Sequence, residues 1–216
     1  MDKITVISAL HLFVLGDAHA YSAKITYVQG SVQVGRGEHF EKAELDQKVT
    51  AGEIIKTGTG STVILTTEDQ SQLKLKENSE LQLSDPKNNE VFLKTGGLFS
   101  KITKAPETHF HVKTHTAVMG VRGTRFYTSY GEEKQKDDVW MCVNEGLVAV
   151  ETPGDQPMMV KEGYGVFAPP KRKVSEPKPF EWTKKLNWNM DPEKGDVVDH
   201  TDMKAAYGNL LKQNYD

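Results

Sequence analysis

Three histidines, His109, His111 and His115, have the spacing in this sequence that best suits metal chemistry. Alternate residues of a β-strand share a face, so His109 and His111 point the same way, and His115 joins them if the strand continues. Three imidazoles could hold Zn²⁺, or could form a pH-sensitive surface. Phe110 and Val112 need the opposite, buried face, so we expect solvent-facing histidines and keep them only as metal candidates.

The single cysteine, Cys142, is the next residue that could do chemistry. One cysteine can form neither an internal disulfide nor a thiolate metal cluster. As a nucleophile it would need a nearby His or Asn that activates it, and the sequence identifies none. We therefore predict a buried structural thiol.

Two pairs of carboxylates, Glu132-Glu133 and Asp137-Asp138, flank a lysine-rich stretch that reads as a hairpin loop. Paired carboxylates can act as general acid and base. At the tip of a hairpin they are more often solvated charge. No set of nucleophile, base and acid emerges from the sequence, so we predict no catalytic residues and no enzyme activity.

One interpretation of the string from Gly120 to Thr124, Gly-Val-Arg-Gly-Thr, is a phosphate-binding loop. It lacks the lysine and the strand–loop–helix context of a P-loop. We expect a tight turn between two strands, in which Gly120, Arg122, Gly123 and Thr124 have structural roles. Either Arg122 or Arg125 would hydrogen-bond to carbonyl groups or to a carboxylate.

The elements that must position these residues are short strands. Apolar residues alternate with polar ones in segments such as Leu73–Leu75, Val91–Leu93 and Val148–Val150, and glycines and polar turns separate the segments. This pattern predicts an all-β fold, either a β-solenoid or a twisted β-sandwich. The predicted strands are 25–28, 31–34, 62–66, 72–76, 80–84, 90–94, 109–113, 124–130, 138–143, 147–151 and 158–161.

Residues 1–20 have the pattern of a signal peptide. Lys3 precedes a mostly apolar run from Ile4 to Leu15, and Ala18-His-Ala20 fits the small-x-small cleavage rule. The apolar run is shorter than the ~20 residues that span a bilayer. We predict cleavage after Ala20 and an exported mature chain without a transmembrane segment. The periplasm is the expected location, with the cell surface and the medium left open.

The composition changes after the predicted β domain, which covers residues 21–168. Residues 169–181 hold several prolines beside the basic run Lys171–Lys173, and read as a solvated linker. In residues 182–216, Trp182 and Trp188 are too apolar to stay in water, so this segment should dock on the β domain. A short helix is expected from Asp202 to Gln213.

The overall charge and hydropathy exclude some classes of partner. The formal net charge is −3, the mean hydropathy is −0.54, and 37% of the residues are hydrophobic. Such a chain is soluble, and it has no electrostatic reason to bind nucleic acid or an anionic membrane. The sequence shows no cofactor motif, so no cofactor is expected.

Three stretches of the sequence resemble one known family. They are Ala51–Gly58 with the strands that follow it, Val91–Leu98, and Phe110–Phe126 with its Gly-Val-Arg-Gly-Thr-x-Phe string. These runs are similar to the FecR domain, the periplasmic domain of bacterial iron-citrate sensor proteins. The resemblance implies a β-solenoid or twisted sandwich that binds other envelope proteins.

The sequence departs from the family at several points. His115 stands where the family usually has proline, and Asp69-Gln70 replaces a more common aspartate-glycine turn. Sensor members also carry an anti-sigma helix bundle and a membrane helix ahead of the domain, where we expect only an export signal. The family's transmembrane signalling therefore does not carry over intact.

Together these features predict an exported, non-enzymatic FecR-type β domain that binds a protein partner or acts as a scaffold in the bacterial envelope, with a role in signalling left open. One alternative is a small-ligand or metal sensor that uses the face of His109, His111 and His115. Another is a module associated with carbohydrate or peptidoglycan. The sequence identifies neither the partner nor the oligomeric state.

Overall fold

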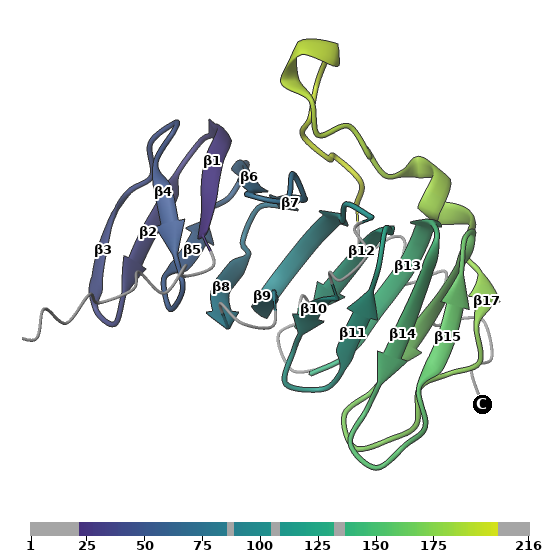
Figure 1. The fold of residues 1–216 in the computed structure, drawn as a ribbon. Helices are drawn as coiled ribbons and strands as arrows, with labels where there is room; N and C mark the ends of the chain where they lie inside the picture. Colours follow the sequence, from purple (N-terminus) through teal and green to yellow (C-terminus); the bar gives the residue numbers. More distant parts are fainter. Residues whose placement is uncertain (1–21, 86–88, 105–108, 132–136, 203–216) are drawn as a thin grey trace, which may run out of the picture.

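A computed structural model describes residues 22–85, 89–104, 109–131 and 137–202 of the chain. These residues form a 17-stranded sheet that is open at its ends and folds on itself into two layers (Figure 1). The structure is therefore all-β, as the alternation predicts. It takes the form of a twisted sandwich rather than a solenoid.

Each layer contains strands from both ends of the chain. Layer A consists, in spatial order, of β4 (Lys48–Thr50), β1 (Ser22–Gln29), β6 (Thr62–Thr67), β7 (Gln72–Leu75), the second half of β9 (Glu90–Lys101), β12 (Arg125–Tyr130), β13 (Val139–Glu145), β16 (Tyr164–Ala168) and β17 (Lys178–Pro179). Layer B consists of β3 (His39–Lys42), β2 (Val32–Arg36), β5 (Ile54–Thr57), β8 (Glu80–Asp85), the first half of β9, β10 (Phe110–Lys113), β11 (Val118–Val121), β14 (Leu147–Glu151) and β15 (Met158–Lys161).

The strand β9 belongs to both layers. Its first half pairs antiparallel with β8 and parallel with β10, and its second half pairs with β7 and β12. The change of layer falls at Gly96 and Gly97. Gly96 has a φ of +89°, and a Cβ on Gly97 would lie 2.4 Å from the hydroxyl of Tyr127. Only glycine fits this bend without strain or a clash.

The core lies between the two layers. Alternate residues of almost every strand point inward and are buried, for example Leu73 and Leu75 in β7 and Val148 and Val150 in β14. This packing follows from the two-residue period of the sequence, since one face of each strand is apolar. Burial of these faces is the main favourable contribution to the stability of the sandwich.

The passages between layers depend on residues with positive φ. Glycine adopts this conformation without the steric cost that other residues meet, and Asn and Asp tolerate it. Within the described residues, the passages contain Gly30, Asp46, Gly52, Gly60, Asn78, Gly96, Gly123, Gly146 and Gly163 at positive φ. The glycines that separate the predicted strands are therefore mostly the points at which the chain changes layer.

The strands β3, β4, β5, β11, β16 and β17 are not among the predicted ones. Apart from β16, which has five residues, each has at most four. In β5 both Ile54 and Ile55 are buried, and in β11 a glycine interrupts the apolar pattern, so neither strand shows a clear period of two. The remaining predicted strands overlap observed ones.

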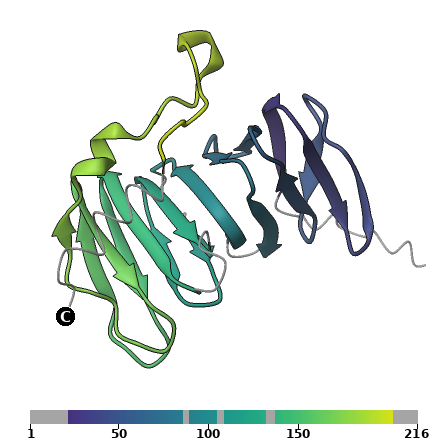
Figure 2. The ribbon, with the colours of Figure 1, turned by 180° about the vertical axis from the view of Figure 1, so that it is seen from behind.

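Residues 180–202, here called the C-terminal strap, run back over the outer face of layer A (Figures 1 and 2). The strap contains the short 3₁₀-helices η1 (Glu181–Lys185) and η2 (Pro192–Lys194). A second apolar cluster fills the space beneath it, in which Phe180, Leu186, Met190 and Val197 pack on residues of β6, β9, β12 and β13. The half-buried ring of Trp188 joins this cluster at the edge of Phe99, 5.2 Å between ring centroids.

Part of the predicted linker 169–181 also contacts the sandwich. Val174 reaches the core between the layers, Ser175 accepts a hydrogen bond from the backbone N–H of Phe167, and β17 pairs with β16. The predicted signal peptide and most of the predicted helix from Asp202 to Gln213 lie outside the described residues. Within the described ranges, no helix is long and apolar enough to cross a membrane.

Candidate binding surfaces

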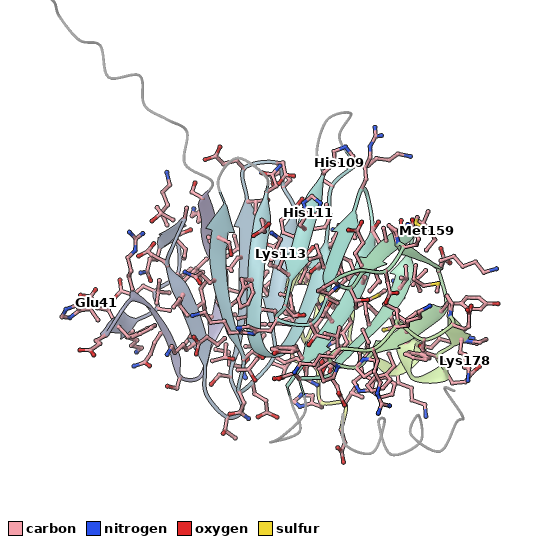
Figure 3. The ribbon with its side chains drawn as sticks, turned by 90° about the horizontal axis from the view of Figure 1, so that it is seen from below. Glu41, His109, His111, Lys113, Met159 and Lys178 are labelled. Atoms are coloured by element: carbon pink, nitrogen blue, oxygen red, sulfur yellow. The ribbon has the colours of Figure 1, made fainter. Side chains whose placement is uncertain are left out.

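The predicted alternation at the histidines is confirmed for β10. Phe110 and Val112 are buried in the core, whereas His111 is half-buried and His109, just before the strand, is exposed on the outer face of layer B. Figure 3 shows His109 and His111 following one another along this face, ahead of Lys113. The two imidazoles therefore face away from the core.

The strand does not continue to His115, which the shared face would require. β10 ends at Lys113, and the chain turns between Thr114 and Ala117, where the hydroxyl of Thr114 accepts hydrogen bonds from two backbone N–H groups. The ring of His115 instead contacts the edge of Phe92, with centroids 4.8 Å apart. In the described part of the chain, no group of three His, Cys, Asp or Glu residues could hold a metal ion.

The C-terminal half of layer B carries an apolar patch on its outer face. Registers across β10, β11, β14 and β15 align His111 with Gly120, Gly120 with Ala149, and Ala149 with Met159. Two small residues thus lie between larger ones. Met159 is 51% exposed and Leu147 is 48% exposed. We call this surface the β10–β15 patch, which consists of His111, Val118, Gly120, Leu147, Ala149 and Met159.

The patch ends at a strand edge. Within the described residues, β15 pairs with β14 on one side and with no strand on the other. An unpaired edge presents backbone N–H and C=O groups that can pair with another chain. Exposed apolar side chains beside such an edge are typical of a protein-binding surface.

The N-terminal half of the same outer face is charged instead. Glu80 lies 3.3 Å from the Nζ of Lys56 and 3.6 Å from that of Lys94, and Glu90 pairs with Lys113 at 2.5 Å. These pairs cross between neighbouring strands and are partly open to solvent. Such partly exposed pairs contribute little stability, at most about 1 kcal/mol each, but they keep this half of the face hydrated.

The outer face of layer A carries two lysines on β7 that the strap buries. The Nζ of Lys74, which is 1% exposed, donates to the carbonyls of Asn187, Asn189 and Val197 at 2.6–2.9 Å and lies 4.3 Å from the centroid of the Phe99 ring. The Nζ of Lys76 forms a buried ion pair with Asp199 at 2.7 Å. The two ammonium groups therefore fasten the strap to the sheet.

Burial affects the acid–base behaviour of Lys74. Desolvation disfavours its charged form and lowers its pKa from 10.5 to about 8, although the carboxylate of Asp199 acts in the opposite direction. No motif in the sequence singles out Lys74 or Lys76. The alternation with Leu73 and Leu75 does place both lysines on the face opposite the core, but nothing local indicates that this face is covered.

Of the residues predicted to form the turn, Gly120 lies within β11, and the chain turns only after Val121. Gly123 has a φ of +64°, and a Cβ there would lie 2.6 Å from the Cβ of Lys104. The hydroxyl of Thr124 donates to the carbonyl of Leu147 at 3.0 Å, and the carbonyl of Thr124 accepts from the N–H of Ile102. The buried Nε of Arg125 has no hydrogen-bond partner among the described residues.

The other chemical candidates lie apart from one another. Cys142 is fully buried beneath the strap, and burial raises the pKa of its thiol to about 12, so it stays protonated at neutral pH. Asp137 accepts a hydrogen bond from the hydroxyl of Tyr130, whereas the pair Glu132-Glu133 lies outside the described residues. The basic run Lys171–Lys173 is exposed.

Comparisons with known proteins agree with this architecture. The family model described as FecR protein matches residues 53–149. No curated protein matches the sequence. Two crystal structures, each of a "putative anti-sigma factor" from Parabacteroides distasonis ATCC 8503, are similar in fold.

The two structures match the chain to different extents. The first has 18% identity and a TM-score of 0.51, with 58% of this chain and 59% of that chain covered. The second has 16% identity and a TM-score of 0.52, with 74% and 90% covered. This chain therefore spans little more than half of the first protein. At these identities the likeness shows the fold alone.

Proposed function

Because residues 53–149 form a FecR domain, we propose that this chain is a non-enzymatic module that binds a protein partner in the bacterial envelope and acts there in signalling or regulation. The observation that carries the proposal is the β10–β15 patch, where exposed Leu147 and Met159 adjoin an unpaired strand edge. The likeness in fold to proteins described as anti-sigma factors supports a regulatory role.

The patch suggests how the partner would bind. A strand of the partner would pair with the free edge of β15 and continue layer B, while its side chains would pack on Met159 and Leu147. Gly120 and Ala149 are small residues between His111 and Met159, and an apolar side chain of the partner would pack over Ala149. This mode needs neither a cofactor nor a catalytic residue.

A photo-crosslinking amino acid at Met159 tests this proposal in the native envelope. We expect one discrete crosslinked protein from position 159 and none from position 41, since Glu41 lies in β3 at the far end of layer B (Figure 3). The double variant Leu147→Lys, Met159→Lys should lose the crosslink to the same protein from a probe at Ala149 while it melts like the parent. Equal crosslinking from positions 41 and 159, or none from either, would refute the proposed surface.

Export is part of the same proposal. We propose that residues 1–20 are removed as a signal peptide, that residues 21–168 form the β domain, and that residues 169–181 connect it to residues 182–216. The small residues at positions 18 and 20 and the apolar run before them support cleavage after Ala20. N-terminal sequencing of protein from the native envelope checks this, and a mature chain that begins at Met1 would contradict it.

A further inference from the structure

A cleft lies between the outer face of layer A and the η2 turn of the strap. Its volume is about 630 Å³, within the range of roughly 300–1,000 Å³ that is usual for small-molecule sites. Gln72, Lys101 and Arg125 line it from β7, β9 and β12, and the strap contributes the stretch from Trp188 to Pro192 together with Lys194. Two parts of the chain that are far apart in sequence thus build one site.

Arg125 is the unusual residue of this cleft. It is half-buried, and its Nε is shielded from solvent without a hydrogen-bond partner. A buried donor on a charged group is costly when it is left unsatisfied, so a bound group would compensate it. The planar guanidinium suits a carboxylate, which it can hold through two parallel hydrogen bonds.

The charges around Arg125 favour an anionic ligand. Lys101, Arg125 and Lys194 line the cleft against one carboxylate, Asp191. That carboxylate already pairs with Lys194 at 2.8 Å, and its pKa is lowered mainly by this hydrogen bond. Lys101 donates only a long hydrogen bond, 3.4 Å, to Gln72. The cleft is therefore locally positive, although the chain as a whole carries a net charge of −3.

The neutral residues of the cleft favour a hydroxylated ligand. Thr26 and Thr66 supply hydroxyl groups, which hydrogen-bond to each other at 3.0 Å but can accept further hydrogen bonds, and Gln70 supplies an amide that can both donate and accept. Trp188 lines the same cleft, and the flat indole can pack on the C–H face of a sugar ring. The indole N–H is already used, because it donates to the carbonyl of Thr183 at 2.8 Å, so the ring itself offers apolar surface.

We propose that this cleft binds a carboxylate-bearing sugar. Arg125 and Lys101 hold the carboxylate, Trp188 packs on the sugar ring, and the threonine and glutamine side chains contact its hydroxyl groups. The site lies on the opposite face of the sandwich from the β10–β15 patch. It is therefore independent of the proposed protein partner, and either proposal can fail without the other.

Isothermal titration of the full mature chain with two matched disaccharides tests the proposal. N-acetylglucosaminyl-N-acetylmuramic acid carries a lactyl carboxylate, and N,N′-diacetylchitobiose lacks it. We expect saturable one-to-one binding of the first and at least about tenfold weaker binding of the second, because the charge-assisted bonds to Arg125 are lost. Equal binding of both, or binding of neither at millimolar concentration, overturns the proposal.

Matched variants identify the residues. Arg125→Gln should weaken binding of the acidic disaccharide about tenfold. It should melt like the parent, because the buried Nε of Arg125 makes no hydrogen bond that the substitution would break. Arg172→Gln removes the same charge from an exposed position elsewhere and should change nothing. Loss of affinity in both variants would show a general charge effect and would refute a site at Arg125.

Two further measurements separate a sugar from other acidic ligands. Binding should change the tryptophan fluorescence of the parent but not that of Trp188→Phe, since Trp188 lies at the site. Lactate alone and the dipeptide Ala-Glu should bind at least about tenfold more weakly than the acidic disaccharide. If either binds as tightly, the cleft recognises an acidic group or a peptide end, and the assignment to a sugar is wrong.

Discussion

The two outer faces of the sandwich differ in what covers them. The outer face of layer A carries large apolar and aromatic side chains, including Ile64, Phe99 and Trp140, and the C-terminal strap buries them. The outer face of layer B carries charged pairs at one end and the β10–β15 patch at the other, and the patch leaves Leu147 and Met159 exposed. The chain thus covers the more apolar outer face, that of layer A, with its own C-terminal strap. The outer face of layer B, which is partly charged and partly apolar, stays open to a partner.

The largest effect should follow from removal of an anchor of the strap. Phe180 is 2% exposed, and its ring lies directly on Gly165 and near Trp140. Phe180→Ala should lower the free energy of unfolding by about 3–5 kcal/mol, because it leaves a cavity beneath the strap. Urea denaturation measures the loss.

A matched variant on layer B provides the control. Phe40 is half-buried in β3 beneath the ammonium of Lys56, which lies 4.2 Å from its centroid. Phe40→Ala should cost less than about 1 kcal/mol, as is usual for sites outside the core. If Phe180→Ala and Phe40→Ala lower the free energy of unfolding by the same amount, the strap is not the tightly packed cover that distinguishes layer A.

A smaller loss should follow when the connection between the layers is strained. Gly123→Val places a β-branched residue at a φ of +64° and against Lys104, so we expect a loss of about 1–3 kcal/mol. Gly37 has nearly the same φ, +62°, in the β2–β3 turn within layer B, and a Cβ there meets nothing within 4 Å. Gly37→Val should therefore lower the free energy of unfolding by less than Gly123→Val does. Thermal melts compare the two, and an unchanged melting temperature for Gly123→Val would rule out the strain.

The strap should also become more stable as the pH rises. The pKa of Lys74 is about 8 in the folded protein and 10.5 when the strap or the chain opens. Between these values the open state binds more protons, so raising the pH favours the closed state, by about 1 kcal/mol from pH 8 to pH 9. Denaturation at both pH values measures the gain.

Lys74→Met isolates this contribution. The raised pKa values of Cys142 and Tyr130, each about 12, act in the opposite direction at higher pH, because the folded state then binds more protons. The difference between parent and variant removes their effect. If the difference in free energy of unfolding between the parent and Lys74→Met is the same at pH 8 and pH 9, the strap does not lower the pKa of Lys74.

The smallest effect is expected at the histidines of layer B. The triple variant His109→Ala, His111→Ala, His115→Ala should have a free energy of unfolding within about 1 kcal/mol of that of the parent, since these side chains lie outside the core. Calorimetry with Zn²⁺ should give no stoichiometric heat for either protein. A one-to-one isotherm that the triple variant loses would restore the metal-sensor alternative.

The sequence predicts the strand content well, because most strands bury one face and therefore alternate. The sequence also predicts a turn at Gly123, because the apolar pattern stops at this glycine and resumes after it. It does not distinguish a solenoid from a sandwich. That choice depends on which strands pair with which, and the pairing of β9 with both layers joins residues that no local pattern connects.

The binding surfaces are harder to predict than the strands. The β10–β15 patch arises when four strands align His111, Gly120, Ala149 and Met159, a register that only the folded chain defines. The tryptophans of the strap do predict docking, but not the face on which it occurs. Lys74 looks like an ordinary solvent-facing lysine in sequence, because its cover lies more than a hundred residues away.

The double membership of β9 has a consequence for how the protein folds. Strands from the N-terminal half, β7 and β8, and strands from the C-terminal half, β10 and β12, use this one segment as their central neighbour. Neither half has a complete sheet without it, so neither should persist as a separate folding unit. We expect a single cooperative transition, reached slowly because the parallel pair with β10 and the distant β12 must close long loops first.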